Sequence, residues 1–188
     1  VAEARKRHWS VQLGLPLPRQ KYATASGQQR ETVRPGGIFC LGALPCNVHT
    51  RQHYDGVDEV ALFDSRRYTR MTLPLGKGKE GILVHNYYAA QTHDGESGIE
   101  NVRALRRLFR AASGHGQIPG VICLDGNVPM GTNSPLRAPM EEFGWVDAAE
   151  LQRKVDGKEP EPTYSPDGNF GPARGSRGLM VYSSTRGR

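Results

Sequence analysis

One long amphipathic segment lies between two short runs of apolar residues near the middle of the chain. The run at 121–124 ends in the sequence Asp-Gly-Asn, and the run at 82–88 follows a glycine- and lysine-rich turn at 76–81. Runs of this length, bounded by turn residues, are typical of buried strands, and we expect 121–124 to be buried on both faces. Between them, apolar residues recur every three or four positions over 99–112, which predicts an amphipathic helix.

The boundaries of this helix also follow from the sequence. Ser97 and Glu100 have the Ser-x-x-Glu spacing of a capping box, and Gly114 and Gly116 stand where the helix should end. Strand, loop, helix and strand therefore follow one another over 81–127, which is a unit of the α/β class. With 188 residues, the chain has the length of one domain with a substantial core, and we predict a single α/β domain over 1–188.

The rest of the chain carries weaker patterns. A short helix should end at Gly144, and the turn at 76–81 should join a half-exposed strand to the run at 82–88 as a hairpin. Proline, glycine, glutamine and arginine dominate residues 1–35, which we predict to be irregular, and residues 151–162 are charged and without a period. The remaining strand-like segments lie at 36–41, 67–73 and 176–183.

The charge balance favours an anionic partner. The chain has 25 Lys and Arg against 19 Asp and Glu, a net charge of +6. We predict that nucleic-acid phosphates contact the arginines of the helix surface and of the half-exposed strand, although such a surface is also compatible with a simple solvated face. No apolar run approaches the length of a membrane span, so we expect an intracellular protein, nuclear or cytoplasmic, without membrane contact. The predicted phosphate contacts are Arg70, Arg103, Arg106 and Arg107.

Two histidines have the spacing of a metal-binding pair. His49 and His53 are four residues apart, which brings two imidazoles together on a helix. Pro45 and Asn47 argue against a helix here, and no acidic ligand motif follows. We therefore interpret both as surface histidines and predict no metal ligand among them.

The strand at 121–124 ends in two polar side chains that suit a catalytic site. Positions two apart in a strand face the same side, so Asp125 and Asn127 are directed at one point beyond the strand end. Sites on α/β sheets usually lie there. The alternative is an Asp-Gly turn in which Asn127 caps the loop.

Six segments stand in an order that is informative as a set. They are Val84-His85-Asn86-Tyr87-Tyr88, the helix 100–112, Leu124-Asp125-Gly126-Asn127, Phe143-Gly144-Trp145-Val146-Asp147-Ala148, Thr163-Tyr164, and Ser176-Arg177-Gly178-Leu179-Met180-Val181. This order resembles the endonuclease/exonuclease/phosphatase superfamily. Within it, the segments resemble the endonuclease part of a non-LTR retrotransposon polyprotein.

The resemblance implies a two-sheet α/β sandwich that hydrolyses phosphodiesters with Mg²⁺, at a site on the sheet ends. It implies that Asp125 activates or positions the water and that Asn127 holds the phosphate. It further implies that Tyr87 contacts the phosphate, with Tyr88 as the alternative if the register shifts by one. A nucleic acid, with DNA preferred over RNA, is the implied partner.

The chain also departs from the family pattern. Leu179 stands where the family has an aspartate, and neither the Gln-Glu strand that supplies metal ligands nor the final Ser-Asp-His has a counterpart in 1–188. We therefore expect a partial or degenerate sandwich that lacks the family's first and last strands. It would be a hydrolase of weak or no activity. The alternatives are a non-catalytic, basic nucleic-acid-binding module and a transposon remnant.

Overall fold

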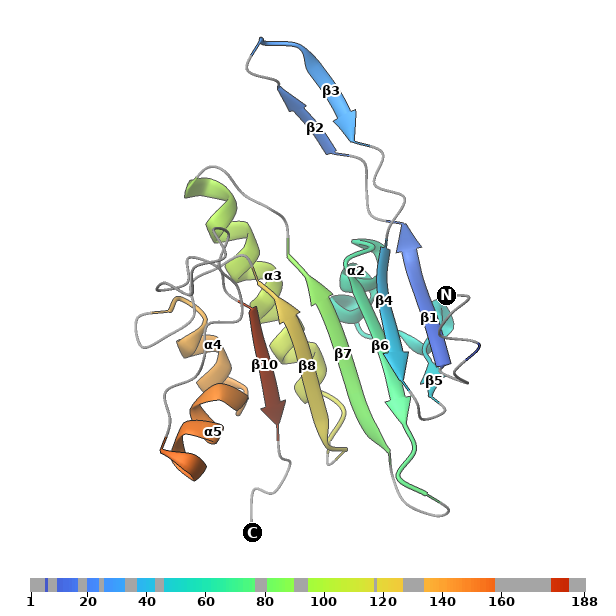
Figure 1. Ribbon diagram of the computed structural model, residues 1–188, viewed down its shortest axis with the longest axis vertical. Helices are drawn as coiled ribbons and strands as arrows, with labels where there is room; N and C mark the ends of the chain where they lie inside the picture. The colour runs from blue at the N-terminus through green and yellow to red at the C-terminus, as the bar shows by residue number, and fades with distance from the viewer. Residues whose placement is uncertain are drawn as a thin grey trace.

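The computed structural model shows a mixed α/β architecture with two short sheets beside a longer one (Figure 1). This confirms the α/β class expected from the sequence. No helix in the described part of the chain is long and apolar enough to span a lipid bilayer. The structure describes residues 6, 10–16, 20–23, 26–32, 37–42, 46–76, 81–89, 95–116, 118–126, 134–157 and 177–182.

The main sheet has six strands in the order β5-β6-β7-β8-β10-β9. Only β7 and β8 are parallel, and every other neighbouring pair is antiparallel. The expected hairpin is therefore present as β6 and β7, and β8 is a central strand between β7 and β10. The strands are β5 (Asn47–Val48), β6 (Tyr68–Leu73), β7 (Ile82–Tyr88), β8 (Gly120–Asp125), β9 (Val146–Asp147) and β10 (Arg177–Tyr182).

Two helices cover one face of this sheet. The helix α3 (Gly95–Ser113) connects β7 to β8, as parallel neighbours require, and α2 (Val57–Asp64) packs against both α3 and β6. The helix α3 is the amphipathic helix predicted at 99–112, but it begins at Gly95, two residues before the expected cap at Ser97. The largest apolar side chains that are 0% exposed are those of Leu105, Leu108, Phe109, Ile122 and Leu136.

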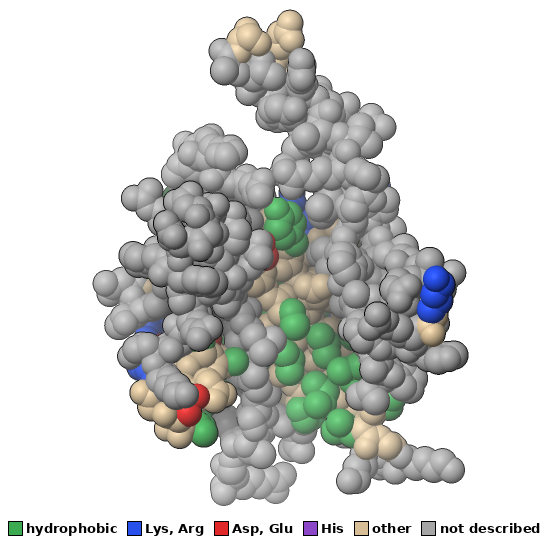
Figure 2. Space-filling view, viewed as in Figure 1, with side chains coloured by type: hydrophobic (Ala, Val, Ile, Leu, Met, Phe, Trp, Pro, Cys, Tyr) green, Lys and Arg blue, Asp and Glu red, His purple; other side chains and the backbone are tan. Residues whose placement is uncertain are grey.

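The strands next to α3 are buried on one face only. Buried and partly exposed residues alternate along β7 and β8, with Leu83, Ile122 and Leu124 on the helix side. Val84 and Val121 project to the opposite face and are only partly buried. Figure 2 shows hydrophobic side chains gathered on this second face of the sheet. The expectation of burial on both faces is therefore wrong for the described residues.

A second, two-stranded sheet lies over part of that face. It consists of β1 (Ser10–Pro16) and β4 (Gly37–Gly42), which pair antiparallel. β4 lies close to β6 and β7 without forming a ladder with either, so the two sheets form separate layers. Met71 follows Arg70 in β6 and thus projects away from the helices, yet it is only 6% exposed. This arrangement is a partial two-sheet sandwich.

The N-terminal region is more regular than its composition suggests. In addition to β1, it contains β2 (Gln20–Ala23) and β3 (Gln29–Thr32), which form a hairpin. The prediction of an irregular segment over 1–35 is therefore wrong. The strand β1 pairs with β4, more than twenty residues later in the chain. It does carry a strand signal, because Val11, Leu13 and Leu15 alternate with polar residues or glycine, but the prolines and glycines around it obscure this alternation.

Two short helices follow β8. They are α4 (Arg137–Glu142), which is the short helix expected to end at Gly144, and α5 (Ala148–Asp156). The carboxylate of Asp147 accepts the amide of Ala149 at 2.9 Å at the start of α5, and Gly157 ends it at φ +70°. The sequence of α5 appeared irregular because most of its side chains face solvent. Thr163 and Tyr164 lie outside the described residues.

Candidate functional site

The carboxyl ends of β7 and β8 meet at one edge of the main sheet. Because these strands are parallel, their last residues, Tyr88 and Asp125, occupy paired positions. The amide of Ala89 donates a hydrogen bond of 2.8 Å to the carbonyl oxygen of Asp125, which continues the pairing past the end of β7. Asp125 is partly exposed, so its carboxylate is accessible at the edge where sites on α/β sheets usually lie.

The two tyrosines at the end of β7 project from opposite faces. Tyr87 pairs with Leu124 and is 4% exposed, in the core on the helix side. Tyr88 alternates with it and therefore shares the face of Asp125. The structure does not bring Tyr87 and Asp125 together, whereas it places the alternative tyrosine, Tyr88, beside Asp125. Asn127 lies outside the described residues.

Burial also sets the chemistry of Tyr87. Removal of its phenol from water raises the pKa of Tyr87, and the guanidinium groups of Arg67 and Arg107 oppose that rise. The hydroxyl is thus protonated at neutral pH and lies within the field of two cations. This is a packed position under the helix layer, and the regular alternation of β7 is the reason that Tyr87 points there.

Arg67 fixes the chain where β7 ends. Its guanidinium donates to the carbonyl oxygens of Tyr88 at 3.4 Å and Ala89 at 3.2 Å, and lies 5.7 Å from the centre of the Tyr88 ring. The amide of Tyr88 in turn donates to the carbonyl of Arg67 at 2.9 Å. These contacts tie the start of β6 to the residue beside Asp125. No local pattern marks this role of Arg67, because its partners are backbone atoms 21 and 22 residues away.

The described residues do not fit a Mg²⁺ site. No group of three or more His, Cys, Asp or Glu among them is arranged to hold a metal ion. Asp125 provides one carboxylate, whereas Mg²⁺ in proteins is usually bound through carboxylates and substrate phosphates together. Leu179, in place of the family aspartate, pairs with Cys123, and Arg177 pairs with Asp125. We therefore derive no catalytic step through a metal.

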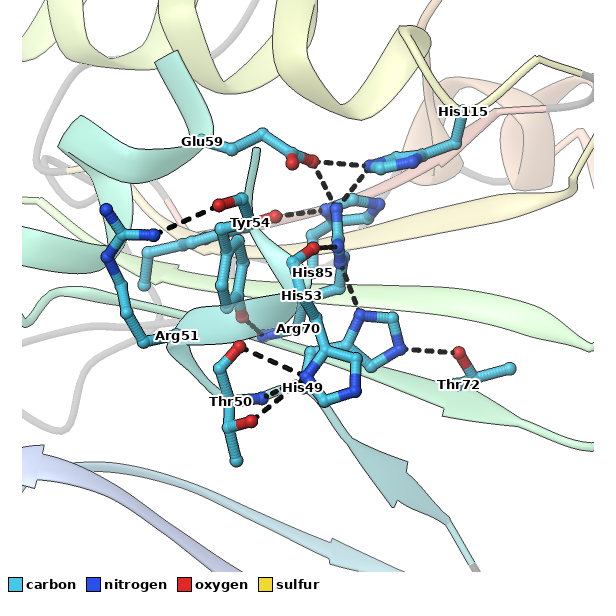
Figure 3. A network of polar contacts seen from close by, with 11 residues as sticks. His49, Thr50, Arg51, His53, Tyr54, Glu59, Arg70, Thr72, His85 and His115 are labelled. Atoms are coloured by element: carbon cyan, nitrogen blue, oxygen red, sulfur yellow. Dashed lines mark hydrogen bonds and ion pairs between the residues drawn. The ribbon is translucent and has the colours of Figure 1, made fainter. Parts of the chain in front are cut away.

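A second polar cluster is buried between β6 and the helices (Figure 3). We call it the Arg70 network, comprising His49, Tyr54, Glu59, Arg70 and His115. Arg70 is 3% exposed, and its guanidinium pairs with the carboxylate of Glu59. Its Nε donates to His49 Nδ1 at 2.8 Å, and one terminal nitrogen donates to the carbonyl of His53 at 2.7 Å. Every side of the buried cation is therefore occupied.

The other members of the Arg70 network link three segments of the fold. Nε2 of His115, in the loop after α3, lies 2.7 Å from Oε1 of Glu59 on α2. The Tyr54 ring centre is 4.7 Å from the Arg70 guanidinium carbon, and the Tyr54 hydroxyl accepts the amide of Arg70 at 3.2 Å. The network thus attaches the helix layer to the sheet. Its groups satisfy one another, which indicates a structural role.

Two residues of the network differ from what the sequence predicted. Arg70 was expected on a phosphate-binding surface, but its guanidinium is buried and paired, so it does not contact a partner there. His49 was expected at the surface, but it is partly buried, and its Nε2 is 2.8 Å from Thr72 Oγ1. No local signal marks either role, because the partners of Arg70 lie between 11 and 45 residues away. His53 is exposed, as expected.

Histidines in and beside the network are held neutral. Burial, together with the charge of Arg70, lowers the pKa of His49 to about 4. Burial also lowers the pKa of His115, and it lowers the pKa of His85 well below its ordinary value. The Tyr68 hydroxyl forms a hydrogen bond of 2.7 Å with His85 Nδ1. The other ring nitrogen, His85 Nε2, has no hydrogen-bond partner among the described residues.

Acidic partners engage most of the arginines on the outer surface of α3. Arg103 pairs with Glu100 at 2.5 Å, Arg106 with Glu142 at 2.8 Å, and Arg110 with Asp58 at 2.6 Å. Arg107 forms no ion pair within the described part of the chain. The predicted phosphate contacts of Arg103, Arg106 and Arg107 stay predictions. Arg103 and Arg106 would have to break an ion pair to bind a phosphate, whereas Arg107 has no such pair among the described residues.

Solved structures provide the comparison for this fold. No protein-family model matches the chain, and no curated protein sequence matches it. An AP endonuclease from Archaeoglobus fulgidus has a TM-score of 0.58 at 18% identity, over 96% of this chain and 69% of that one. The human nocturnin catalytic domain with bound sulfate has a TM-score of 0.54 at 12% identity, over 97% and 63%. The chain therefore has an α/β fold of the endonuclease/exonuclease/phosphatase type, as predicted, and spans about two thirds of each structure.

Proposed function

We propose that this chain is an endonuclease-type phosphodiester hydrolase domain that acts on nucleic acid, and that by itself it hydrolyses at most trace amounts of substrate. The observation that carries the proposal is the pairing of Tyr88 with Asp125 at the carboxyl edge of two parallel strands. This pairing puts a carboxylate and a phenol on one face at the edge where α/β folds bind substrates.

The chemistry assigns a role to each residue. Asp125 orients the water that attacks phosphorus and accepts its proton, while the Tyr88 hydroxyl donates to a non-bridging phosphate oxygen. The bond from phosphorus to the leaving ester oxygen breaks, and solvent water protonates that oxygen. Asn127, from the family resemblance, holds the phosphate. Mg²⁺, also from that resemblance, requires ligands beyond those among the described residues. One carboxylate without such ligands leaves the charge of the transition state poorly compensated, which accounts for the expected weak activity.

The choice of nucleic acid as substrate has two supports. One similar fold is an AP endonuclease, and the other holds a sulfate anion, which has the shape and charge type of a phosphate group. The net charge of +6 favours a polyanion over a neutral substrate. We propose DNA before RNA. From the sequence resemblance we also propose a retrotransposon-type version of the fold, and we propose that it is partial or degenerate, because Leu179 replaces a family aspartate.

The test is cleavage of an abasic duplex and of a supercoiled plasmid in Mg²⁺ and in Mn²⁺, for the native chain and for Asp125→Ala. The matched control is Asp64→Ala, at an exposed residue of α2. We expect trace cleavage at most, lost in Asp125→Ala and kept in Asp64→Ala, together with salt-dependent binding. Robust cleavage that only Asp125→Ala abolishes would identify a fully active hydrolase. If the native chain neither binds nor cleaves these substrates, the proposal is overturned.

A second candidate is a non-catalytic nucleic-acid-binding module. The single carboxylate at the sheet edge favours it, since no metal-binding group of acidic residues accompanies Asp125 among the described residues. Both candidates bind DNA, and they differ in whether replacement of Asp125 changes any product. Binding without cleavage in either metal would select the module.

A further inference from the structure

The hairpin of β2 and β3 is a regular two-stranded ribbon. Its antiparallel register pairs Lys21 with Glu31 and Tyr22 with Arg30. The turn between the strands includes Gly27 at φ +76°, a left-handed conformation that favours glycine. Ser26, Gly27 and Gln28 are exposed at the tip. The ribbon therefore has a defined backbone and a free end.

Neither strand of this hairpin packs substantially against any other helix or strand in the described part of the chain. Figure 1 shows it standing clear of the main sheet, above the β1–β4 pair. An isolated two-stranded hairpin is marginally stable in water, because it buries little apolar surface and both of its edges are open. A ribbon of this kind gains its stability when a partner covers it.

The hairpin stands at the end of the molecule toward which β7 and β8 run (Figure 1). Asp125 is the last residue of β8, so the ribbon extends beyond the same end of the sheet as the candidate site. Each strand has four residues, so the ribbon reaches on the order of 14 Å at roughly 3.4 Å per residue. The major groove of B-DNA is about 12 Å wide and about 8.5 Å deep, and it admits a two-stranded ribbon.

The segment that carries the hairpin is strongly basic. Residues 17–36 contain four basic residues and one acidic residue, Glu31, so this segment holds +3 of the net +6 of the chain. By contrast, three arginines of α3 are already paired with carboxylates. Unbalanced positive charge is thus concentrated in the part of the sequence that contains the hairpin. The basic residues are Arg19, Lys21, Arg30 and Arg34.

We propose that the β2–β3 hairpin is a DNA-binding finger that enters the major groove of a duplex while the backbone of that duplex lies at the Asp125 edge. The inference rests on the proposed function and adds the element that holds the substrate. Phosphates flanking the groove pair with the basic residues of the finger, and the open strand edges face the duplex. Duplex DNA fits better than a single strand, because a groove encloses both sides of a ribbon.

The test measures binding of a 20-base-pair duplex by fluorescence anisotropy between 50 and 200 mM salt. The variant Lys21→Ala with Arg30→Ala removes two charges from the finger. The matched control, Arg153→Ala with Lys154→Ala, removes two charges from the exposed surface of α5. We expect the finger variant to bind at least fivefold more weakly at low salt, with the slope of log affinity against log salt reduced by about two. The control should stay within twofold of the native chain.

A second readout makes the result independent of overall charge. Amides of residues 20–32 should exchange more slowly with deuterium when the duplex is added, and the finger variant should lose this protection. The thermal midpoint should be unchanged in the variant, since neither finger strand packs substantially against another helix or strand in the described part of the chain. Equal losses in the two charge variants, an unprotected hairpin, or no duplex binding would each overturn the inference. Tighter binding to single-stranded DNA or to RNA would overturn the assignment to a duplex groove.

The outcome is separable from that of the proposed function. Binding that depends on Lys21 and Arg30, without any cleavage, would support the DNA-binding role of the hairpin and overturn the hydrolase proposal. Cleavage abolished by Asp125→Ala, with binding that is indifferent to Lys21 and Arg30, would uphold the hydrolase and remove the finger.

Discussion

Arg70 of β6 and Glu59 of α2 form an ion pair whose side chains are 4% and 8% exposed. The two residues are 11 positions apart and attach the first helix of the helix layer to the sheet. Since His115 contacts the same carboxylate, the loop that enters β8 is held at the same point. The position of β8, and with it that of Asp125, therefore depends on a cluster of charges buried on the other face of the sheet.

The first prediction concerns the cost of breaking this pair. Glu59→Gln leaves a buried guanidinium without its anion, and the free energy of unfolding should fall by about 3–5 kcal/mol. The control Glu141→Gln breaks the exposed pair with Arg137, 2.9 Å long, and should cost less than about 1 kcal/mol. Urea denaturation of both variants measures the difference. Equal, small losses would mean that the buried pair adds nothing to stability.

The second prediction concerns acid. The pKa of His49 is lowered to about 4 from 6.5, so the folded protein keeps this imidazole neutral while the unfolded chain takes up a proton. The resulting stability is complete above pH 6.5 and declines as the pH falls toward 4. The lowered pKa values of His85 and His115 act in the same direction. The urea midpoint should drop steadily over this range, and His49→Gln should flatten the decline. A urea midpoint that rises as the pH falls from 6.5 to 4 would contradict this prediction.

The third prediction separates two neighbouring arginines of α3. Arg107→Ala removes a cation that has no acidic partner in the described part of the chain. Arg106→Ala removes one whose Nη2 donates to both carboxylate oxygens of Glu142, at 2.9 and 2.8 Å. If α3 contacts phosphates, replacing Arg107 should lower the salt slope of DNA binding by about one, and replacing Arg106 should lower it less. Identical slopes for both variants and the native chain would define this surface as merely solvated.

The fourth prediction concerns the approach of β7 to β6. A Cβ on Gly81 would lie 2.5 Å from Thr72 Cγ2 and 2.6 Å from the Leu73 carbonyl oxygen, so Gly81→Ala forces the two strands apart. We expect a loss of about 1–3 kcal/mol in unfolding free energy. In Gly126→Ala the added carbon meets leucine side chains at 3.5 Å, which is ordinary contact, and the change should be small. Equal thermal midpoints for the two variants would contradict this account.

The elements that could be predicted are those with a period of their own. The helix at 99–112 and the runs that became β7 and β8 were recognisable because burial under one layer imposes a regular spacing of apolar residues. Asp125 could be predicted from its place at the end of such a run. The side chain of Tyr87 could not be placed, since a shift of one residue exchanges the faces of a strand, and only the pairing with Leu124 fixes it.

Residues that act through distant partners remained hidden. Arg70 resembles any arginine of a half-exposed strand until Glu59, His49 and His115 are brought around it. The finger strands were missed because each is specified by a partner strand and has few apolar residues. The strand β1 was missed although Val11, Leu13 and Leu15 alternate along it, because the proline- and glycine-rich sequence around it dominated the prediction. The spacing of apolar residues in a sequence reveals elements that bury apolar side chains. Polar networks and exposed ribbons bury few of them, so this spacing does not reveal them.

The order of strands at one side of the sheet bears on how the chain is made. β10 lies between β8 and β9, and it pairs with β8 along all six of its residues. During translation, both neighbours leave the ribosome before the strand that joins them. The backbone edge of β8 is then open on a nascent chain and offers a template for wrong pairing with other polypeptides. We expect a chaperone that shields strand edges to raise the yield of folded protein, and a stop codon before Arg177 to yield aggregates.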